Sequence, residues 1–343
     1  MNCFKKEHIN RLKEVIKNDS KIILLTHLNP DGDAIGSVLG LHIVLRNKGY
    51  HSHVIIPNNA PDFLEWMPDF NEIIFYKHKR EQAKKLMDEA DVAFCIDFNA
   101  ANRLGKMEDY FNEKSFFKVL IDHHPEPEKF CQICFSDTSA SSASELVFEF
   151  IVEMGIFDAM NKKAAECLLA GIIADTGSFS YNSSNPKTYA IVGKLLQFGV
   201  DKNRINSNIY DNFSADRLRF LGFALNEKMK VFPEASSAYI SLTQEEMKKY
   251  NFKIGDTEGF VNYPLSIKGI YFTAIILEMN DHIKFSFRSK GNFPSNEIAK
   301  KYFEGGGHVN ASAGRLNITM QEAENKLEEI IDKYKNDINK SWD

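Results

Sequence analysis

The chain has 343 residues, of which 43% are hydrophobic and 26% are charged, so its composition is that of a folded globular protein and its length predicts about two domains. The formal net charge of -5 argues against a protein that coats long duplex DNA through its overall charge, although it leaves room for a local basic pocket. The apolar runs of the chain, such as Ile22–Leu25 and Ala274–Leu277, are too short to cross a bilayer, and the N-terminal residues lack the apolar block of a signal peptide. The 5 scattered cysteines fit a reducing compartment, so we expect a cytoplasmic protein without a membrane partner.

Strands and helices alternate along the first half of the chain. Apolar runs rich in β-branched residues predict strands at 21–27, 53–57, 92–97, 118–122 and 131–135. Helical spacing of apolar residues predicts helices at 33–48, 81–89, 142–154 and 162–174. This order indicates an α/β fold with a mostly parallel sheet that carries helices on both faces. Within the first of these helices, Gly36 and Gly40 predict close packing against another helix.

The remainder of the chain is predicted to be a helical connection followed by a smaller α/β domain. The expected divisions are a first domain at 1–185, a helical linker at 186–230 and a second domain at 231–343. In the last of these, strands are predicted at 238–242, 271–277 and 283–288, helices at 244–250 and 295–303, and a glycine-rich turn at 305–307. A capping box of Thr319 and Glu322 predicts the start of a long terminal helix.

The most informative segment is 26–37, in which His27 ends a strand while Asp31 and Asp33 lie in the loop that opens the next helix. A proline and a glycine in this loop would hold a tight turn, so that three ligand-type side chains can converge. In an open parallel sheet, ligands bind beyond the carboxyl ends of the strands. The alternative interpretation is an ordinary turn in which Asp33 caps the following helix.

The same kind of residue recurs at other strand and helix ends. Asp97 follows one apolar strand, Asp122-His123-His124 ends another, and Asp175 ends an apolar helix. Carboxylates with imidazoles suit Mn²⁺ or a similar divalent ion. These side chains are too many for one tetrahedral zinc and fit a centre of two metal ions with a shared carboxylate, which implies a phosphate ester or anhydride as the substrate.

At these residues the chain resembles the DHH phosphoesterase superfamily, which is named for the triplet found here as Asp122-His123-His124. Its motifs appear in order, and Gly305-Gly306-Gly307-His308, preceded by Arg288-Ser289, looks like the signature of the DHH-associated domain. The combination resembles the nanoRNase A subgroup, which comprises bifunctional oligoribonucleases and 3′-phosphoadenosine-5′-phosphate phosphatases. Ala313 departs from the paired glycines that many members carry before Gly314.

The resemblance implies a role for each motif residue. One metal ion would be bound by His27, Asp31 and Asp97, and the second by Asp33, Asp97, His123 and Asp175, with Asp97 bridging and Asp175 as a second candidate bridge. The expected cofactor is a pair of Mn²⁺ ions, with Mg²⁺ or Co²⁺ as alternatives. As catalytic residues, His124 would face the substrate and Asp122 would orient a histidine through the ring nitrogen that does not bind metal.

Residues 284–301 contain a single acidic residue and an excess of cationic ones. The cations are Lys284, Arg288, Lys290, Lys300 and Lys301. Each lysine could equally belong to an ordinary solvated surface, but the Arg288 guanidinium at a strand end can bind a phosphate through two hydrogen bonds. Backbone N–H groups at Gly305–Gly307 can approach an anion closely, and His308 adds a donor. Arg103 is a further candidate for phosphate binding, with a helix-end salt bridge as its alternative.

The resemblance implies a hydrolase that releases 5′-mononucleotides from very short single-stranded RNA and converts 3′-phosphoadenosine-5′-phosphate to AMP. The alternatives are a pyrophosphatase or exopolyphosphatase, a phosphodiesterase of linear dinucleotides, and a catalytically silent nucleotide-binding protein. The last would tolerate loss of a metal ligand, yet every expected ligand is present. The sequence leaves the oligomeric state open, with a homodimer as one option.

Overall fold

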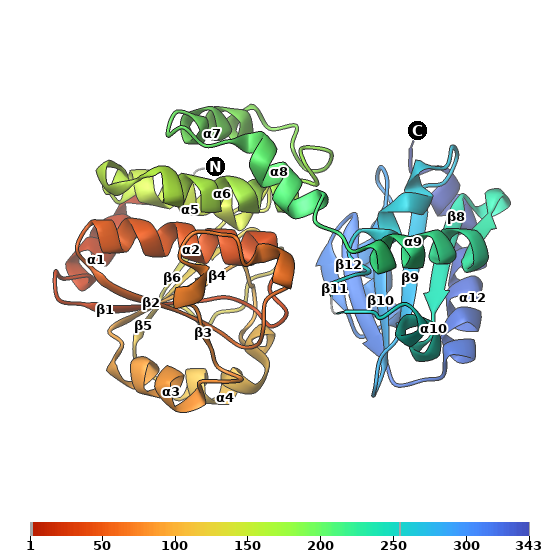
Figure 1. Cartoon of the computed structure of the whole chain (residues 1–343), viewed down its shortest axis with the longest axis horizontal. Coiled ribbons are helices and arrows are strands. Elements are labelled where there is room, and N and C mark those ends of the chain that lie inside the picture. The colour runs from red at the N-terminus through yellow and green to blue at the C-terminus, as the bar shows by residue number, and fades with distance from the viewer. Residues whose placement is uncertain (1–2, 254, 343) are drawn as a thin grey trace. The chain divides into compact units, whose positions relative to one another are not determined.

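The computed structural model describes residues 3–253 and 255–342. The chain forms two compact units, divided between Asn212 and Phe213. Within the segment predicted as a linker, helices α7 (Pro186–Leu196) and α8 (Lys202–Tyr210) belong to the first unit, and α9 (Ala215–Glu227) belongs to the second (Figure 1). No helix among the described residues is long and apolar enough to span a membrane.

The first unit is built on a parallel sheet of six strands in the order β3-β2-β1-β4-β5-β6. These strands are β1 (Lys21–Leu25), β2 (His51–Ile56), β3 (Ile74–Phe75), β4 (Val92–Ile96), β5 (Phe117–Asp122) and β6 (Ile133–Ser136). The strand order reverses between β1 and β4, and open α/β sheets bind their ligands beyond the carboxyl ends of the strands at such a point. The predicted parallel sheet is therefore confirmed, and its strand order places the reversal between β1 and β4, which the sequence did not predict.

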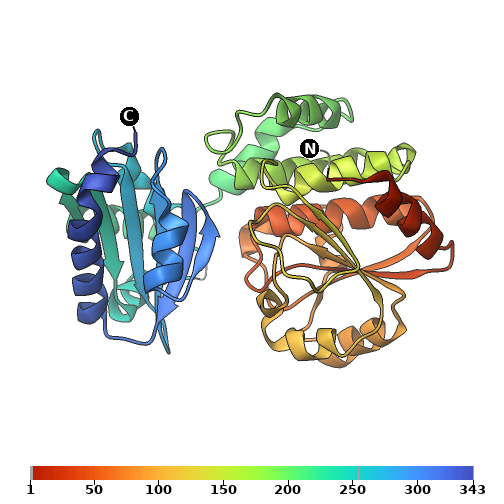
Figure 2. The same cartoon turned by 180° about the vertical axis from the view of Figure 1, so that it is seen from behind.

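Helices cover both faces of this sheet, as Figures 1 and 2 show. One face is packed by α1 (Lys6–Val15), α2 (Gly32–Asn47), α5 (Ala143–Glu153) and α6 (Lys162–Asp175). The other is packed by α3 (Arg80–Glu89) and α4 (Glu108–Asn112). Alternate residues of each strand enter the two cores, so that Leu24 lies in the first and Leu25 in the second.

Helices α2 and α6 pack closely against each other, which brings the start of α2, with Asp33, near the end of α6, with Asp175. A Cβ at Gly36 would lie 2.5 Å from the carbonyl oxygen of Cys167, and one at Gly40 would lie 2.5 Å from the side chain of Leu168. The predicted helix contact at Gly36 and Gly40 is thus confirmed. At the same interface a Cβ at Gly32 would lie 2.5 Å from Ala174, which is next to Asp175.

The second unit contains a six-stranded sheet in the order β11-β12-β10-β9-β8-β7. Its strands are β7 (Met229–Phe232), β8 (Ser237–Leu242), β9 (Phe272–Glu278), β10 (Ile283–Ser289), β11 (Gly306–His308) and β12 (Ala311–Leu316). Neighbouring strands are antiparallel except for β8 and β9. Its helices are α9, α10 (Gln244–Lys249), α11 (Ser295–Tyr302) and α12 (Met320–Asn339), the last starting at the predicted capping box of Thr319.

The glycine-rich segment at 305–307 was predicted to be a turn, and this is wrong for most of it, because Gly306–His308 forms β11 at the edge of the sheet. The glycines permit close approach of the backbone to β12. A Cβ at Gly305 would lie 2.0 Å from the carbonyl oxygen of Ala313, and Gly307 has a φ of +136°. Short 3₁₀ segments complete the fold at Asp62–Leu64, Phe70–Glu72, Ala101–Met107, Phe157–Ala159, Pro233–Ala235 and Phe260–Ser266.

Candidate metal centre

His27 follows β1 and is buried, and its ring is oriented by the backbone beside it. The Nδ1 nitrogen lies 2.9 Å from the carbonyl oxygen of Leu28, which can only accept, so Nδ1 carries the proton and donates. The Nε2 nitrogen is then available as a ligand and lies 3.6 Å from Oδ2 of Asp97. Burial lowers the pKa of His27, but Asp97 and Asp31 outweigh this effect and the pKa is raised.

Asp31 is the residue that caps α2, so the alternative in which Asp33 caps this helix is wrong. Oδ1 of Asp31 accepts hydrogen bonds of 3.0 Å and 3.0 Å from the N–H groups of Asp33 and Ala34. Asp33 instead points to the start of α5, where its two oxygens accept hydrogen bonds of 2.6 Å from the N–H of Ala143 and 2.9 Å from that of Ser144. A helix N-terminus stabilises a carboxylate, so this contact fixes the position of Asp33.

Gly171 on α6 is a further residue of the site, and the sequence interpretation missed it. A Cβ at this position would lie 2.7 Å from Oδ1 of Asp33 and 2.0 Å from Oγ of Ser144. Any larger side chain would therefore displace Asp33 or the start of α5. The only signal in the sequence is a glycine inside an apolar helix, which is not specific.

Asp97 lies at the end of β4 between two groups of candidate ligands. It has a φ of +66°, in the left-handed region that few residues other than glycine adopt, and such strain concentrates at functional sites. Oδ2 faces Nε2 of His27 at 3.6 Å, whereas Oδ1 faces Nε2 of His123 at 3.4 Å. Oδ1 is buried and has no hydrogen-bond partner among the described residues. A carboxylate with its two oxygens turned to different ligand groups is suited to bridging two cations.

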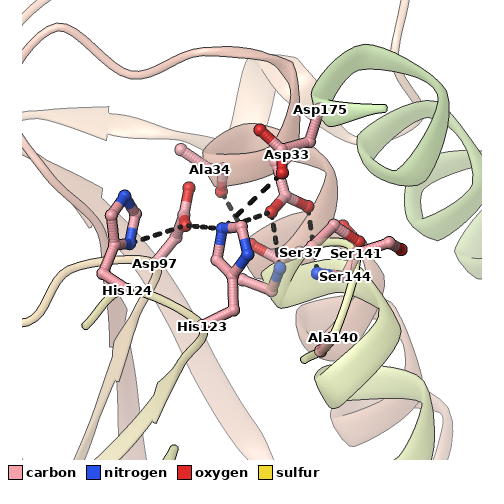
Figure 3. A network of polar contacts seen from close by, with 12 residues as sticks. Asp33, Ala34, Ser37, Asp97, His123, His124, Ala140, Ser141, Ser144 and Asp175 are labelled. Carbon is pink, nitrogen blue, oxygen red and sulfur yellow. Dashed lines mark hydrogen bonds and ion pairs between the residues drawn. The ribbon is translucent and has the colours of Figure 1, made fainter. Parts of the chain in front are cut away.

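His123 and His124 follow β5 and have different surroundings (Figure 3). Nε2 of His123 lies 3.7 Å from Oδ2 of Asp175 and 3.9 Å from Oδ2 of Asp33. Nδ1 of His124 lies 2.8 Å from Oδ1 of Asp122, a hydrogen bond in which the imidazole donates. Asp122 thus orients His124, whereas His123 faces several carboxylates.

Asp175 ends α6 and is the most accessible acid of the cluster, with 31% of its side chain exposed. Burial against neighbouring groups raises its pKa to about 6, and His123 opposes the increase. Asp33 is almost fully buried, and burial together with Asp97 and Asp175 raises its pKa well above the usual value. The pKa of Asp97 would also rise on burial, but contacts with His123 and His27 lower it well below the usual value. Several acids so close together are costly without cations.

The donor set fits two divalent ions. One ligand atom each from His27, Asp31 and Asp97 lie within 4.8 Å of one another, and the same holds for Asp33, His123 and Asp175. Donors that share an ion at about 2.1 Å are about 3–4 Å apart, which is longer than a hydrogen bond and similar to the distances around His123. The six predicted ligands therefore lie in the two predicted groups. Asp97 was predicted to belong to both; the structure places it in the first group, and its Oδ1 lies 3.4 Å from Nε2 of His123 in the second.

The predicted substrate-binding residues lie in both units. Arg103 is exposed and close enough to His27 to lower the pKa of that imidazole. In the second unit, Arg288 lies on one face of β10, whereas Ser289 is buried on the other face. Oγ of Ser289 donates to the carbonyl of Phe293 at 2.7 Å and so stabilises the following turn. His308 ends β11 at the edge of the sheet.

Comparisons with known proteins agree with this geometry. The model of the DHH family, N-terminal domain, matches residues 21–172, and that of the DHHA1 domain matches residues 238–340. A crystal structure of an exopolyphosphatase-related protein from Bacteroides fragilis is 44% identical, with 98% of each chain covered and a TM-score of 0.93. The chain belongs to the DHH family of phosphoesterases.

Curated relatives of this DHH protein cover nearly its whole length. A probable bifunctional oligoribonuclease and PAP phosphatase NrnA from Streptococcus mutans is 28% identical, with 92% of this chain and 95% of the relative covered. The bifunctional oligoribonuclease and PAP phosphatase NrnA from Bacillus subtilis is 27% identical, with 90% of this chain and 93% of the relative covered. The resemblance predicted from the motifs is confirmed.

Proposed function

We propose that this DHH protein hydrolyses very short oligoribonucleotides to 5′-mononucleotides and removes the 3′-phosphate of 3′-phosphoadenosine-5′-phosphate. The observation that carries this proposal is Asp97, whose two oxygens face separate groups of metal-ligand side chains. The substrate class is supported by the names of the relatives from Streptococcus mutans and Bacillus subtilis, which match along most of both chains. Its five free cysteines are compatible with the cytoplasm, where these substrates occur.

We propose that His27, Asp31 and Asp97 bind one divalent ion and that Asp33, Asp97, His123 and Asp175 bind the second. Carboxylate and imidazole ligands suit Mn²⁺, with Mg²⁺ and Co²⁺ as alternatives. Such ions lower the pKa of bound water and stabilise charge on a phosphoryl group. The role of the chain in this arrangement is to fix the ligands, as the contacts of Asp33 with α5 and of His27 with Leu28 do.

The other predicted site residues would bind the phosphate groups of the substrate. Asp122 accepts a hydrogen bond from Nδ1–H of His124, which leaves the other imidazole nitrogen as the candidate phosphate contact. Arg103 adds a positive charge close to His27. In the second unit, Arg288 and His308 would bind a terminal phosphate, and the glycines before His308 allow the backbone of β11 to lie against β12.

A panel of substrates tests this function. Purified protein with Mn²⁺ should release AMP from 3′-phosphoadenosine-5′-phosphate and mononucleotides from di- to pentaribonucleotides, and a chelator should abolish both activities. Because the Bacteroides fragilis protein is called exopolyphosphatase-related, polyphosphate and pyrophosphate are the necessary comparison substrates. Faster turnover of either of these than of every nucleotide would contradict the proposal, and nucleotide binding without turnover would favour the silent binder.

A further inference from the structure

The second unit carries a row of cations on one face of its sheet, beside the smaller hydrophobic core that β9 shares with α9, since Leu277 of that core is opposite Lys284. In the antiparallel pairing, Lys284 of β10 is directly opposite Arg315 of β12, and Arg288 is opposite Ala311, which is in turn opposite His308 of β11. Directly opposed residues point to the same side of a sheet. The four cationic or donor side chains therefore share one face, which we call the cationic face: Lys284, Arg288, Arg315 and His308.

The pairing of Lys284 with Arg315 is unfavourable in the protein alone. Like charges directly opposite each other destabilise a sheet. Both side chains are exposed, and neither makes an ion pair or side-chain hydrogen bond with another described residue. The pKa of Lys284 is lowered, because the partial burial of its side chain outweighs the opposing charge of Glu258 and Arg288 lowers it further. The pKa of Asp281 is lowered by His282 and to a smaller degree by Arg315.

Between the two ends of the cationic face the sheet carries only small side chains, which leaves a shallow surface. Ser286, Ala313 and Gly306 are opposite one another on β10, β12 and β11 and point to the same side. A Cβ at Gly306 would meet nothing within 4 Å, and its φ is not in the left-handed region, so neither crowding nor backbone geometry requires a glycine there. The opposite side of these strands is filled by Phe285, Phe287 and the residues of α11 and α12.

The spacing of cations along β10 would allow two separate phosphate groups to be bound, one near Lys284 and one near Arg288. Lys284 and Arg288 are four residues apart on one strand, which corresponds to about 13 Å. This distance exceeds the span of the two phosphates on a single nucleoside but is within reach of a short phosphodiester chain. Positive charge at both ends, with only small side chains between them, fits an extended single strand of nucleic acid.

We propose that Lys284 and Arg315 form a second phosphate-binding position, which contacts oligonucleotides longer than a dinucleotide and is not used by a nucleoside bisphosphate. This inference rests on the proposed function, which it deepens by naming the residues that favour longer substrates. The ligand recognised is a flexible phosphodiester chain with several negative charges. Arg288 and His308 would bind the phosphate nearest the end of the chain.

The test compares the double variant Lys284→Gln, Arg315→Gln with a matched double variant, Lys333→Gln, Lys340→Gln. The control removes the same charge from exposed positions at α12, which covers the other side of the sheet. Binding of a fluorescent, hydrolysis-resistant phosphorothioate pentaribonucleotide to the full-length, Mn²⁺-loaded protein is measured by anisotropy at several salt concentrations. Loss of two phosphate contacts should reduce the slope of log K against log salt by about 1.4, because each contact to a single strand contributes about 0.7.

The expected result is weaker binding of the pentaribonucleotide, by about tenfold, and KM for 3′-phosphoadenosine-5′-phosphate within about twofold of the unchanged protein. An unchanged slope, an equal effect of the control variant, or no binding by the unchanged protein would each overturn the inference. Its failure is distinguishable from failure of the proposed function. If no substrate in the panel is hydrolysed but the slope falls as predicted, only the function fails; if hydrolysis is normal and the slope is unchanged, only this inference fails.

Discussion

The proposed metal centre of the first unit and the cationic face of the second would bind phosphate groups in physically different ways. The ligands of the centre are mostly buried, end rigid elements and are fixed by backbone contacts, as the hydrogen bonds of Asp33 to the start of α5 show. The cationic face consists of partly or fully exposed side chains on the antiparallel strands β10, β12 and β11. We therefore expect a small displacement of a ligand in the first region to cause a severe loss of activity, whereas removal of charge in the second should weaken binding gradually.

The largest effect is expected for Asp97→Asn. The asparagine tolerates the left-handed backbone at this position but removes the charge that faces both ligand groups. We expect the turnover of 3′-phosphoadenosine-5′-phosphate to fall by about a thousandfold or more. Activity is measured together with circular dichroism, and a folded variant with near-normal turnover would refute the bridging role.

A smaller but still large effect is expected for Gly171→Ala. The added Cβ would lie 2.0 Å from Oγ of Ser144 and 2.7 Å from Oδ1 of Asp33, so the ligand must move. We expect about a hundredfold loss of activity, because small displacements in an active site are costly. Overpacking should also lower the free energy of unfolding by about 1–3 kcal/mol, as measured by urea denaturation.

The matched control for this variant is Gly193→Ala on α7, where a Cβ would meet nothing within 4 Å. It should raise the free energy of unfolding by about 0.5–1 kcal/mol, because alanine favours a helix, and it should leave activity unchanged. Equal behaviour of the two variants would show that Gly171 has no special relation to Asp33.

Arg288→Ala should give a graded effect in the second unit. Loss of a charged hydrogen-bond donor to phosphate should raise KM for 3′-phosphoadenosine-5′-phosphate by about tenfold and change kcat by less than about twofold. Steady-state kinetics measure both values. If kcat alone decreases, Arg288 acts on the reaction and not on binding, and the contrast between the two regions is lost.

The smallest effect concerns His42, a buried histidine outside both regions. Its Nδ1 lies 2.9 Å from Oγ of Ser52, and burial lowers its pKa although Glu72 opposes the shift. Because the folded state favours the neutral imidazole, the contribution of this residue to stability is complete above about pH 6.5 and decreases as the pH falls below that value.

Urea midpoints at pH 7.5 and 5.5 measure this dependence. The variant His42→Asn should lose less stability between the two values than the unchanged protein, since it has no imidazole to protonate. An identical loss in both proteins would mean that other groups account for the whole pH dependence.

The sequence predicts the strands and helices on which the site residues lie better than it predicts the contacts that hold those residues in position. Asp97 and His123 were located because each follows an apolar run that folds as a buried strand. The relation of Asp33 to α5 was not predictable, since it depends on a contact between residues far apart in the chain. Strand β12 was missed because its sequence, Ala311–Leu316, contains no β-branched or aromatic residue.

The most direct test of the account is the anomalous scattering of crystals grown with Mn²⁺. We predict two peaks about 3.5–4 Å apart, with Asp97 contacting both, His27 and Asp31 at one, and Asp33, His123 and Asp175 at the other. A single peak, or two peaks that do not share Asp97, would contradict the central claim that this carboxylate joins two ions in one centre.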